Sequence, residues 1–201
     1  MRTSLADRPQ GGTAVRAALI DAAAELFALH GPASVSVREI AARAQVNHGL
    51  VHRHFGSKEA LLSTVLAKLA RELAEDMQKG PSRRRPAWRA LRATRKQGTY
   101  WRILAHTLLE GRKVSGVQTD FPVFGALVRA TRNGQAAGRF DVDLDARALT
   151  VTVAALALGL LMFEPYLLAA TGLAEAGEKR RARELLRVLR RMEKGLRPAV
   201  R

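Results

Sequence analysis

Apolar residues recur along the chain at intervals of three and four positions, the spacing of one face of an α-helix. No run keeps the alternating period of two that a half-buried strand shows for long. Gly and Pro divide the chain into segments of helical length. The pattern therefore predicts an all-α fold, with helices over 13–30, 37–44, 48–54, 58–79, 86–96, 99–113, 122–135, 144–171 and 175–194.

Several of these helices begin with a residue that caps a helix N-terminus. Ser36 is followed three positions later by Glu39, and this spacing predicts a capping box in which each side chain bonds the other residue's backbone N–H. Asn47 and Ser57 stand before the next two helices as predicted N-caps. Pro165 lies inside a long apolar segment, where we expect it to kink the helix.

Composition narrows the class of protein. The 34 Lys and Arg residues against 18 Asp and Glu give a net charge of +16, which suits nucleic-acid binding without locating a site. Residues 1–57 carry only 6 of the basic residues and 4 of the acidic ones. The absence of Cys excludes disulfides, Cys-ligated metal and a Cys nucleophile. The polar first dozen residues do not resemble a signal peptide, so we expect a cytoplasmic protein.

Two short predicted helices, 37–44 and 48–54, follow an amphipathic helix and are joined by a tight turn. This arrangement describes a helix-turn-helix, in which the first helix braces the second and the second enters the major groove of DNA. Gly49 keeps the start of the second helix slim enough for close approach to DNA. The polar face of that helix carries His48, Leu50, His52, Arg53 and His54, and its predicted apolar anchors are Val46, Val51 and Phe55.

The residues of this region resemble the N-terminal domain of the TetR family of bacterial transcriptional regulators. The resemblance is carried by VREIA at 37–41 and by VNHGLVHRHFGSKEALL at 46–62, and before them by Ala23, Glu25, Leu26, Phe27 and Gly31. It covers about residues 12–72. It implies a three-helix DNA-binding domain with a connecting helix over 12–72, with its helix-turn-helix at about 35–54. A helical ligand-binding and dimerisation domain over 80–201 would follow.

The resemblance also assigns DNA contacts. Three positions depart from the family pattern: Gln45 replaces a usual Gly, His52 a usual Tyr that contacts phosphate, and Leu50 a frequent Thr or Ser. Leu50 would then make an apolar contact, for example with a thymine methyl. The implied DNA-binding residues are Ser36, Arg38, Asn47, His48, Gly49, Leu50, His52, Arg53, His54 and Lys58. Histidine titrates near neutral pH, so we expect tighter operator binding at pH 6 than at pH 8.

The family further implies a homodimer, usually a repressor, that binds a roughly palindromic operator and releases it when a small-molecule effector binds. We expect no cofactor and no metal. Large or polar residues on the later helices are candidate ligand contacts: Trp88, Tyr100, Trp101, His106, Glu110, Phe124, Met162, Glu164 and Tyr166. The apolar positions of the last two helices that predict a dimer interface are Leu156, Leu160, Leu185, Leu186, Leu189 and Met192.

Other interpretations stay open beside this one. His48 and His52 lie four residues apart and could ligate a metal, but no third ligand is near in the sequence. The 16-residue uncharged run at 148–163 is shorter than a membrane span and is interpreted as a buried helix. The last helix is basic and amphipathic, which suits a membrane surface or, as we prefer, a second subunit. The basic segment 83–96 suits either DNA or, in preference, a solvated face.

Two other functions stay open beside that of a sequence-specific regulator. A sequence-indifferent DNA-binding protein would use the overall charge alone. A helical carrier or enzyme without a role at DNA is the third interpretation, but the chain has no G-x-S-x-G, no phosphate-binding glycine loop and no H-E-x-x-H. Asp141, Asp143 and Asp145 resemble part of a metal loop, yet helix capping explains them better.

Overall fold

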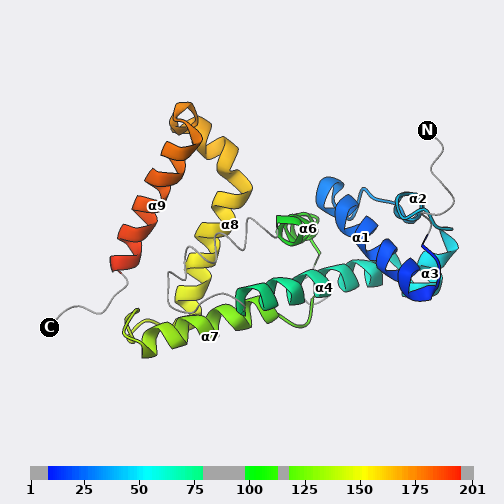
Figure 1. The fold of residues 1–201 in the computed structure, drawn as a ribbon, viewed down its shortest axis with the longest axis horizontal. Coiled ribbons are helices and arrows are strands. Elements are labelled where there is room, and N and C mark those ends of the chain that lie inside the picture. The colour runs from blue at the N-terminus through cyan, green and yellow to red at the C-terminus, as the bar shows by residue number, and fades with distance from the viewer. Residues whose placement is uncertain (1–8, 79–97, 113–117, 196–201) are drawn as a thin grey trace. The chain divides into compact units, whose positions relative to one another are not determined.

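The computed structural model describes residues 9–78, 98–112 and 118–195, which form helices and turns with no strand among them (Figure 1). The all-α fold class is confirmed. The helices are α1 (Gly12–His30), α2 (Val37–Arg43), α3 (Gly49–Phe55), α4 (Lys58–Gln78), α6 (Gly98–Leu109), α7 (Pro122–Ala136), α8 (Ala146–Ala170), the 3-10 helix η3 (Leu173–Glu175) and α9 (Glu178–Gly195). The helix expected over 86–96 lies outside the described residues.

These helices divide into two compact units. Unit 1 contains α1, α2, α3, α4 up to Glu72, and α6; unit 2 contains the end of α4 with α7, α8, η3 and α9. The sequence assigns 99–113 to the C-terminal domain, but α6 packs against α1 inside unit 1. The core of unit 1 is the apolar stripe of each helix, and its side chains with no exposed surface are Leu19, Ala23, Phe27, Ile40, Val51, Leu61, Val65, Leu66, Ala70 and Ile103.

Local capping sets where the helices of unit 1 begin. The Ser36–Glu39 capping box forms, with the Ser36 hydroxyl accepting from the Glu39 amide at 3.2 Å and the Glu39 carboxylate accepting from the Ser36 amide at 2.7 Å. Asn47 Oδ1 accepts from the Gly49 amide at 2.8 Å, and Ser57 Oγ accepts from Ala60 at 3.1 Å. The predicted caps at Ser36 and Ser57 are confirmed, whereas the N-cap position of α3 is His48, and Asn47 just before it bonds the Gly49 amide.

The segment between α1 and α2 is held by groups from α4 and α6. Lys58 Nζ donates to the Pro32 carbonyl at 2.9 Å and to the Val35 carbonyl at 3.0 Å. Directly after α6, the Glu110 carboxylate accepts from the Ala33 amide at 3.0 Å. Gly31 has φ +78° and lies so close to α6 that a Cβ there would be 3.0 Å from Glu110 Oε1. Position 31 therefore favours glycine for two reasons: its φ is positive, and the Glu110 side chain leaves little room for a Cβ.

In unit 2, α7 and α8 pack against each other and share a pair of hydroxyls. Thr131 Oγ1 and Thr150 Oγ1 lie 3.0 Å apart, and each also bonds a carbonyl of its own helix. Gly134 of α7 faces Phe140, a residue only 8% exposed, whose ring occupies the space a Cβ would need. A side chain at position 134 would therefore displace the ring.

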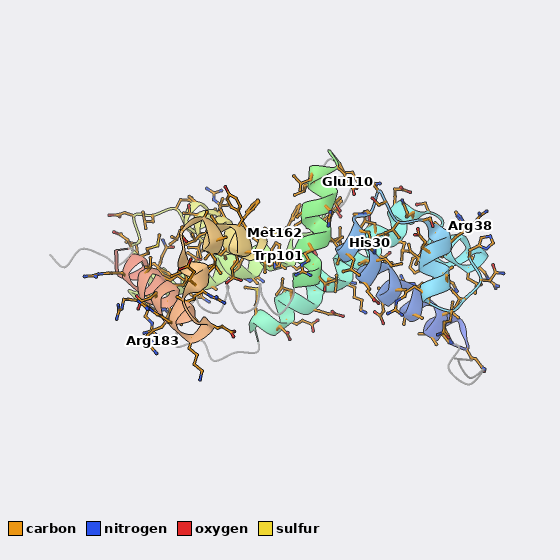
Figure 2. The ribbon with its side chains drawn as sticks, turned by 90° about the horizontal axis from the view of Figure 1, so that it is seen from above. His30, Arg38, Trp101, Glu110, Met162 and Arg183 are labelled. Atoms are coloured by element: carbon orange, nitrogen blue, oxygen red, sulfur yellow. The ribbon has the colours of Figure 1, made fainter. Side chains whose placement is uncertain are left out.

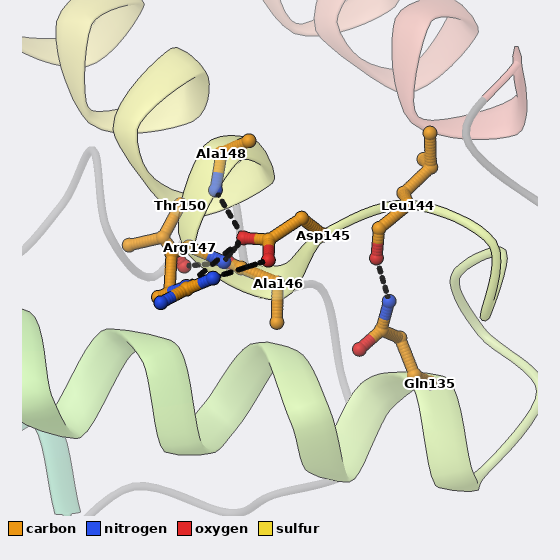
Figure 3. A network of polar contacts seen from close by, with 7 residues as sticks. All are labelled: Gln135, Leu144, Asp145, Ala146, Arg147, Ala148 and Thr150. Carbon is orange, nitrogen blue, oxygen red and sulfur yellow. Dashed lines mark hydrogen bonds and ion pairs between the residues drawn. The ribbon is translucent and has the colours of Figure 1, made fainter.

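The turn before α8 is a local polar network (Figure 3). Asp145 caps α8 by accepting from the amides of Arg147 at 2.7 Å and Ala148 at 3.0 Å. The Arg147 side chain and these amides hold the pKa of the Asp145 carboxyl far below its usual range. Gln135 Nε2 donates to the carbonyls of Asp141 and Leu144. The capping interpretation of this acidic turn is thereby confirmed for Asp145.

Helix α8 is long and apolar enough to cross a membrane by length and composition alone, which is weak evidence for a span. Only 22% of its most apolar window is buried, so the interpretation of 148–163 as a buried helix is wrong for the single chain. Its exposed apolar side chains belong to a helix of unit 2 that is packed on one side by α7. Pro165 lies inside α8, which continues to Ala170. Beyond it, Gly172 has φ +68° and precedes η3, and α9 begins at Glu178, three residues later than the helix expected from residue 175.

We predict that Gly134→Ala lowers the stability of unit 2. A Cβ would lie 2.5 Å from Cδ2 and 2.7 Å from Cε2 of Phe140, and such overpacking costs about 1–3 kcal/mol, more than the helix propensity of Ala returns. Urea denaturation followed by circular dichroism measures the change. Gly125→Ala, in the same helix, meets only the flexible end of Arg129 at 3.4 Å and should be neutral or stabilising. Equal effects of the two changes would contradict the packing described.

A second prediction concerns the turn after α2, which is a Schellman motif. The Val46 amide donates to the Ala41 carbonyl and the Gln45 amide to Ala42, with Gln45 in the left-handed conformation at φ 58°. A side chain at such a position costs about 1 kcal/mol. Gln45→Gly should therefore raise the free energy of unfolding by roughly 0.5–1 kcal/mol. Gln45→Ala keeps the Cβ and should give no gain; a gain equal to that of Gly would refute the strain.

Candidate nucleic-acid interface

The two short helices of the predicted helix-turn-helix pack through a small apolar contact. Ile40 of α2 and Val51 of α3 have no exposed surface, and Ala41 and Ala44 are almost completely buried. Val51 faces inward, so the opposite side of α3 is exposed. The exposed side of α3 begins at His48 and Gly49 and continues at His52 and Arg53, one turn further along.

The first turn of α3 has little side-chain bulk, which would let another molecule approach its backbone closely. Asn47 Oδ1 accepts from the Gly49 amide, and a Cβ at Gly49 would lie 3.3 Å from that oxygen. Leu50 is partly buried beside this turn. The bond leaves the Asn47 side-chain N–H groups available as donors, since only the oxygen is used. A slim, polar first turn is the part of a recognition helix that enters the groove.

The imidazole of His52 is fixed by the end of its own helix. Its Nδ1 lies 3.0 Å from the carbonyl oxygen of Gly56, and the Gly56 amide donates to the His52 carbonyl at 2.8 Å. Gly56 adopts φ 79° as the residue that ends α3. The residue that stops the helix therefore also orients one of its exposed side chains.

His54 does not share the face of His48 and His52. Its ring lies near the start of α1, where a Cβ added at Gly12 would be 3.8 Å from His54 Cε1. Next to it, the guanidinium of Arg16 lies 5.1 Å from the centre of the Phe55 ring. Arg16 is an exposed cation held against the end of α3 by this cation–π contact, and it is not among the DNA contacts predicted from the sequence. Only the packing of α1 on α3, which no local pattern shows, brings the two residues together.

The other predicted DNA contacts lie on α2 and at the start of α4. Arg38 is exposed, and Figure 2 shows it at the outer edge of unit 1. Ser36 uses its oxygen as an acceptor in the capping box, which leaves its hydroxyl proton for another partner. Lys58 uses two of its three donors on the carbonyls of Pro32 and Val35, so its phosphate contact stays a prediction for the remaining N–H.

Four candidate ligand contacts, Tyr100, Trp101, His106 and Glu110, lie on α6 or just after it, in unit 1, and hydrogen bonds engage the hydroxyl of Tyr100 and the carboxylate of Glu110. Burial raises the pKa of Tyr100, and its hydroxyl donates to Gln118 Oε1 at 3.0 Å. Trp101 packs edge-on against Tyr100 with ring centres 4.7 Å apart. His106 and Glu110 lie against Gly31 (Figure 2 labels Glu110), and Glu110 also binds Ala33. The hydrogen bonds of Tyr100 and Glu110 give these two residues a structural role within unit 1, and ligand contact by the four residues stays a prediction.

The remaining ligand candidates of the described chain lie in unit 2. Phe124 on α7 is partly buried, whereas Met162 and Tyr166 on α8 are 38% and 72% exposed. Glu164 borders an apolar cavity of about 340 Å³, whose other lining residues are Leu160, Leu167, Leu168, Thr171, Leu173 and Leu185. The cavity thus joins one ligand candidate to two residues expected at the dimer interface. Trp88 lies outside the described residues.

The predicted dimer residues occupy α8 and α9. Leu156 and Met192 are 40% and 53% exposed, and Leu160, Leu185, Leu186 and Leu189 are partly buried. Further exposed apolar side chains of α8 are Val151, Phe163 and Leu167. A metal site at His48 and His52 finds no support in the structure. Among the described residues, no group of three or more His, Cys, Asp or Glu side chains could hold a metal ion.

Comparison with known proteins agrees with this geometry. The model of the bacterial regulatory proteins of the tetR family matches residues 19–65. The HTH-type transcriptional repressor Rv3405c of Mycobacterium tuberculosis H37Rv is 41% identical over 167 residues, which are 83% of this chain and 82% of that protein. This identity extends well beyond the helix-turn-helix.

Solved structures show the same fold. A transcriptional regulator from Streptomyces coelicolor, SCO4942, aligns with a TM-score of 0.69 and 22% identity over 89% of this chain and 97% of that one. A gamma-butyrolactone receptor, an ArpA-like protein, aligns with a TM-score of 0.55 and 23% identity over 92% and 98% of the two chains. With its helix-turn-helix and a relative similar over most of its length, this chain belongs to the tetR family of bacterial transcriptional regulators.

Proposed function

We propose that the protein is a dimeric, ligand-responsive repressor that binds a palindromic operator through α3. The observation that carries this proposal is the exposed face of α3, which presents His48, Gly49, His52 and Arg53 while the fully buried Val51 anchors the helix from the inner side. A polar face anchored by one apolar residue suits insertion into a major groove. Base edges would meet His48, Gly49 and Leu50, and phosphates would meet Arg38, His52 and Arg53.

Repression is supported by the relative from M. tuberculosis, which is named a repressor and is 41% identical over 83% of this chain. A small-molecule effector is supported by the likeness in fold to a gamma-butyrolactone receptor. Neither name identifies the effector of this chain. As a protein that acts on DNA with no membrane partner, it would work in the cytoplasm.

Dimerisation through α8 and α9 is supported by their apolar surfaces. Phe163 and Tyr166 are 61% and 72% exposed, and Met192 on α9 is 53% exposed. Large apolar patches on a soluble chain mark interaction surfaces, and a two-fold dimer would cover both copies at once. We therefore assign Met162 and Tyr166 to the subunit interface in preference to the effector site, together with the six predicted dimer residues.

The regulatory step would be a shift between two populations. DNA would favour one arrangement of the two recognition helices in the dimer, and the effector would favour another, so each weakens the binding of the other. Within unit 1, Lys58 of α4 and Glu110 at the end of α6 both hold the segment that leads into α2. A movement of either helix would therefore reach the recognition helix.

Selection of bound genomic fragments by the purified protein tests operator binding. We expect a palindrome whose half-sites lie about 34–36 Å apart, or a multiple of that distance. Arg53→Ala should weaken binding to that site about tenfold or more, because it removes a charged contact from each half-site. Arg102→Ala, an exposed change of equal charge on α6, should leave affinity nearly unchanged.

The rival functions give different results in the same experiment. A sequence-indifferent binder would select no palindrome, and the two arginine changes would weaken it equally. A carrier or enzyme without a role at DNA would bind no fragment.

The dimer predicts a second result. Leu156→Asp should give a monomer at micromolar concentration, since it places a charge on each copy within the apolar face of α8. Sedimentation velocity measures the state, and operator affinity should fall with it. Val142→Asp, an equally polar change at a residue 69% exposed outside α8 and α9, should leave the dimer intact. A wild-type chain that sediments as a monomer would overturn the interface.

A further inference from the structure

We propose that His52 contacts an operator phosphate only in its protonated form, so that operator binding takes up protons at this one position of the recognition helix. The inference rests on the proposed function, because it requires α3 to lie at DNA. It goes further by naming the atom that changes state and by separating His52 from the other two histidines of the segment.

The hydrogen bond to Gly56 assigns a proton to Nδ1 of His52. The Nδ1 atom lies 3.0 Å from the carbonyl oxygen of Gly56. A carbonyl oxygen has no proton to donate, so the hydrogen bond exists only when Nδ1 carries the proton. The neutral ring is therefore held as the tautomer with a bare Nε2, which can accept a hydrogen bond but cannot donate one.

The same bond sets the orientation of Nε2. Because Nδ1 is bound to the end of the same helix, Nε2 is directed away from that bond, and the His52 residue is exposed. A phosphate oxygen meeting the neutral ring would face a lone pair. Protonation places an N–H and a positive charge at the same point, which gives a charge-assisted hydrogen bond to the phosphate.

The backbone makes this orientation persistent. Gly56 receives the ring N–H at its carbonyl and donates its own amide to the His52 carbonyl at 2.8 Å. Its φ of 79° favours glycine, and no atom lies within 4 Å of the place a Cβ would occupy. The same residue thus ends α3 and holds the imidazole in one tautomer.

The charged groups around α3 are mostly engaged elsewhere. Arg16 of α1 lies over Phe55, and Lys58 of α4 bonds two carbonyls. On α2, Glu39 is in the capping box and Arg43 is paired with Glu25 at 2.6 Å. The other ionisable residues of α2, of α3 with its preceding residue, and of the first turn of α4 are Arg38, His48, Arg53, His54 and Glu59. Of these, Glu59 is paired with Arg112 at 3.7 Å.

The two other histidines of the segment have different surroundings. His48 precedes α3 and makes no side-chain cap bond. His54 lies against the start of α1. Neither ring is tied to a carbonyl of α3 in the way that fixes His52, so neither is confined to a tautomer that lacks an outward donor. We therefore expect most of the pH dependence of operator affinity to come from His52.

The test measures operator affinity by fluorescence anisotropy between pH 6 and pH 8, at fixed ionic strength, with the selected operator and with random DNA. Wild-type affinity should fall about 10-fold or more over this range, since a dimer carries two such sites. Calorimetry in two buffers of different ionisation enthalpy should show about one to two protons taken up per dimer at pH 7.5. His52→Tyr supplies a hydroxyl donor at every pH tested and should bind with little pH dependence.

His→Gln variants at four positions distinguish an effect of His52 from an effect of the other histidines. His52→Gln should lose the pH dependence, whereas His48→Gln and His54→Gln should retain most of it, whatever their affinity. His30→Gln, at the end of α1, should match the wild type in both respects. A pH dependence that survives in His52→Gln, or a wild type without proton uptake, overturns the inference while specific binding stands. Absence of any preference for the operator over random DNA overturns the proposed function itself.

Discussion

The position of the recognition helix depends on how the backbone of residues 31–36 is satisfied. This segment turns the chain from α1 into α2 and forms no helix of its own, so its carbonyls and amides need partners from elsewhere. Lys58 supplies two donors and Glu110 one acceptor, while the Ser36–Glu39 box closes the end that becomes α2. Since α2 carries Ile40 against α3, the contacts that hold this segment also hold the exposed residues of α3 in position.

The sequence predicts well those features of the fold that depend on hydrogen bonds between residues close together in the chain. The bonds of Ser36, Asn47, Ser57 and Asp145 each span two or three residues, so the residue type and its spacing are enough to predict them. The exposed face of α3 follows in the same way from the burial of Val51. The fold class and the DNA-binding element can therefore be inferred from the order and spacing of the residues alone.

Contacts between residues that are far apart in the sequence cannot be predicted in this way. Glu110 and Ala33 are separated by 77 residues, and nothing in the spacing around Glu110 distinguishes a brace for a distant loop from a ligand contact. The same holds for Arg16 on Phe55, since a cation on an exposed helical face has no local partner to reveal it. Polar residues on apolar helices are good candidates for function because each needs a partner, but the partner of Tyr100 is Gln118 within the same unit.

The two ends of α3 show how backbone conformation and recognition are linked. Both neighbouring turns use positive φ, at Gln45 before the helix and at Gly56 after it, which limits α3 to a short segment. At Gln45 a side chain is retained where glycine would be less strained, whereas at Gly56 the glycine is the residue whose carbonyl holds His52. A helix this short has little stability of its own. Three features therefore fix its exposed face: the burial of Val51, the bond from the Gly49 amide to Asn47 Oδ1, and the bonds between His52 and Gly56.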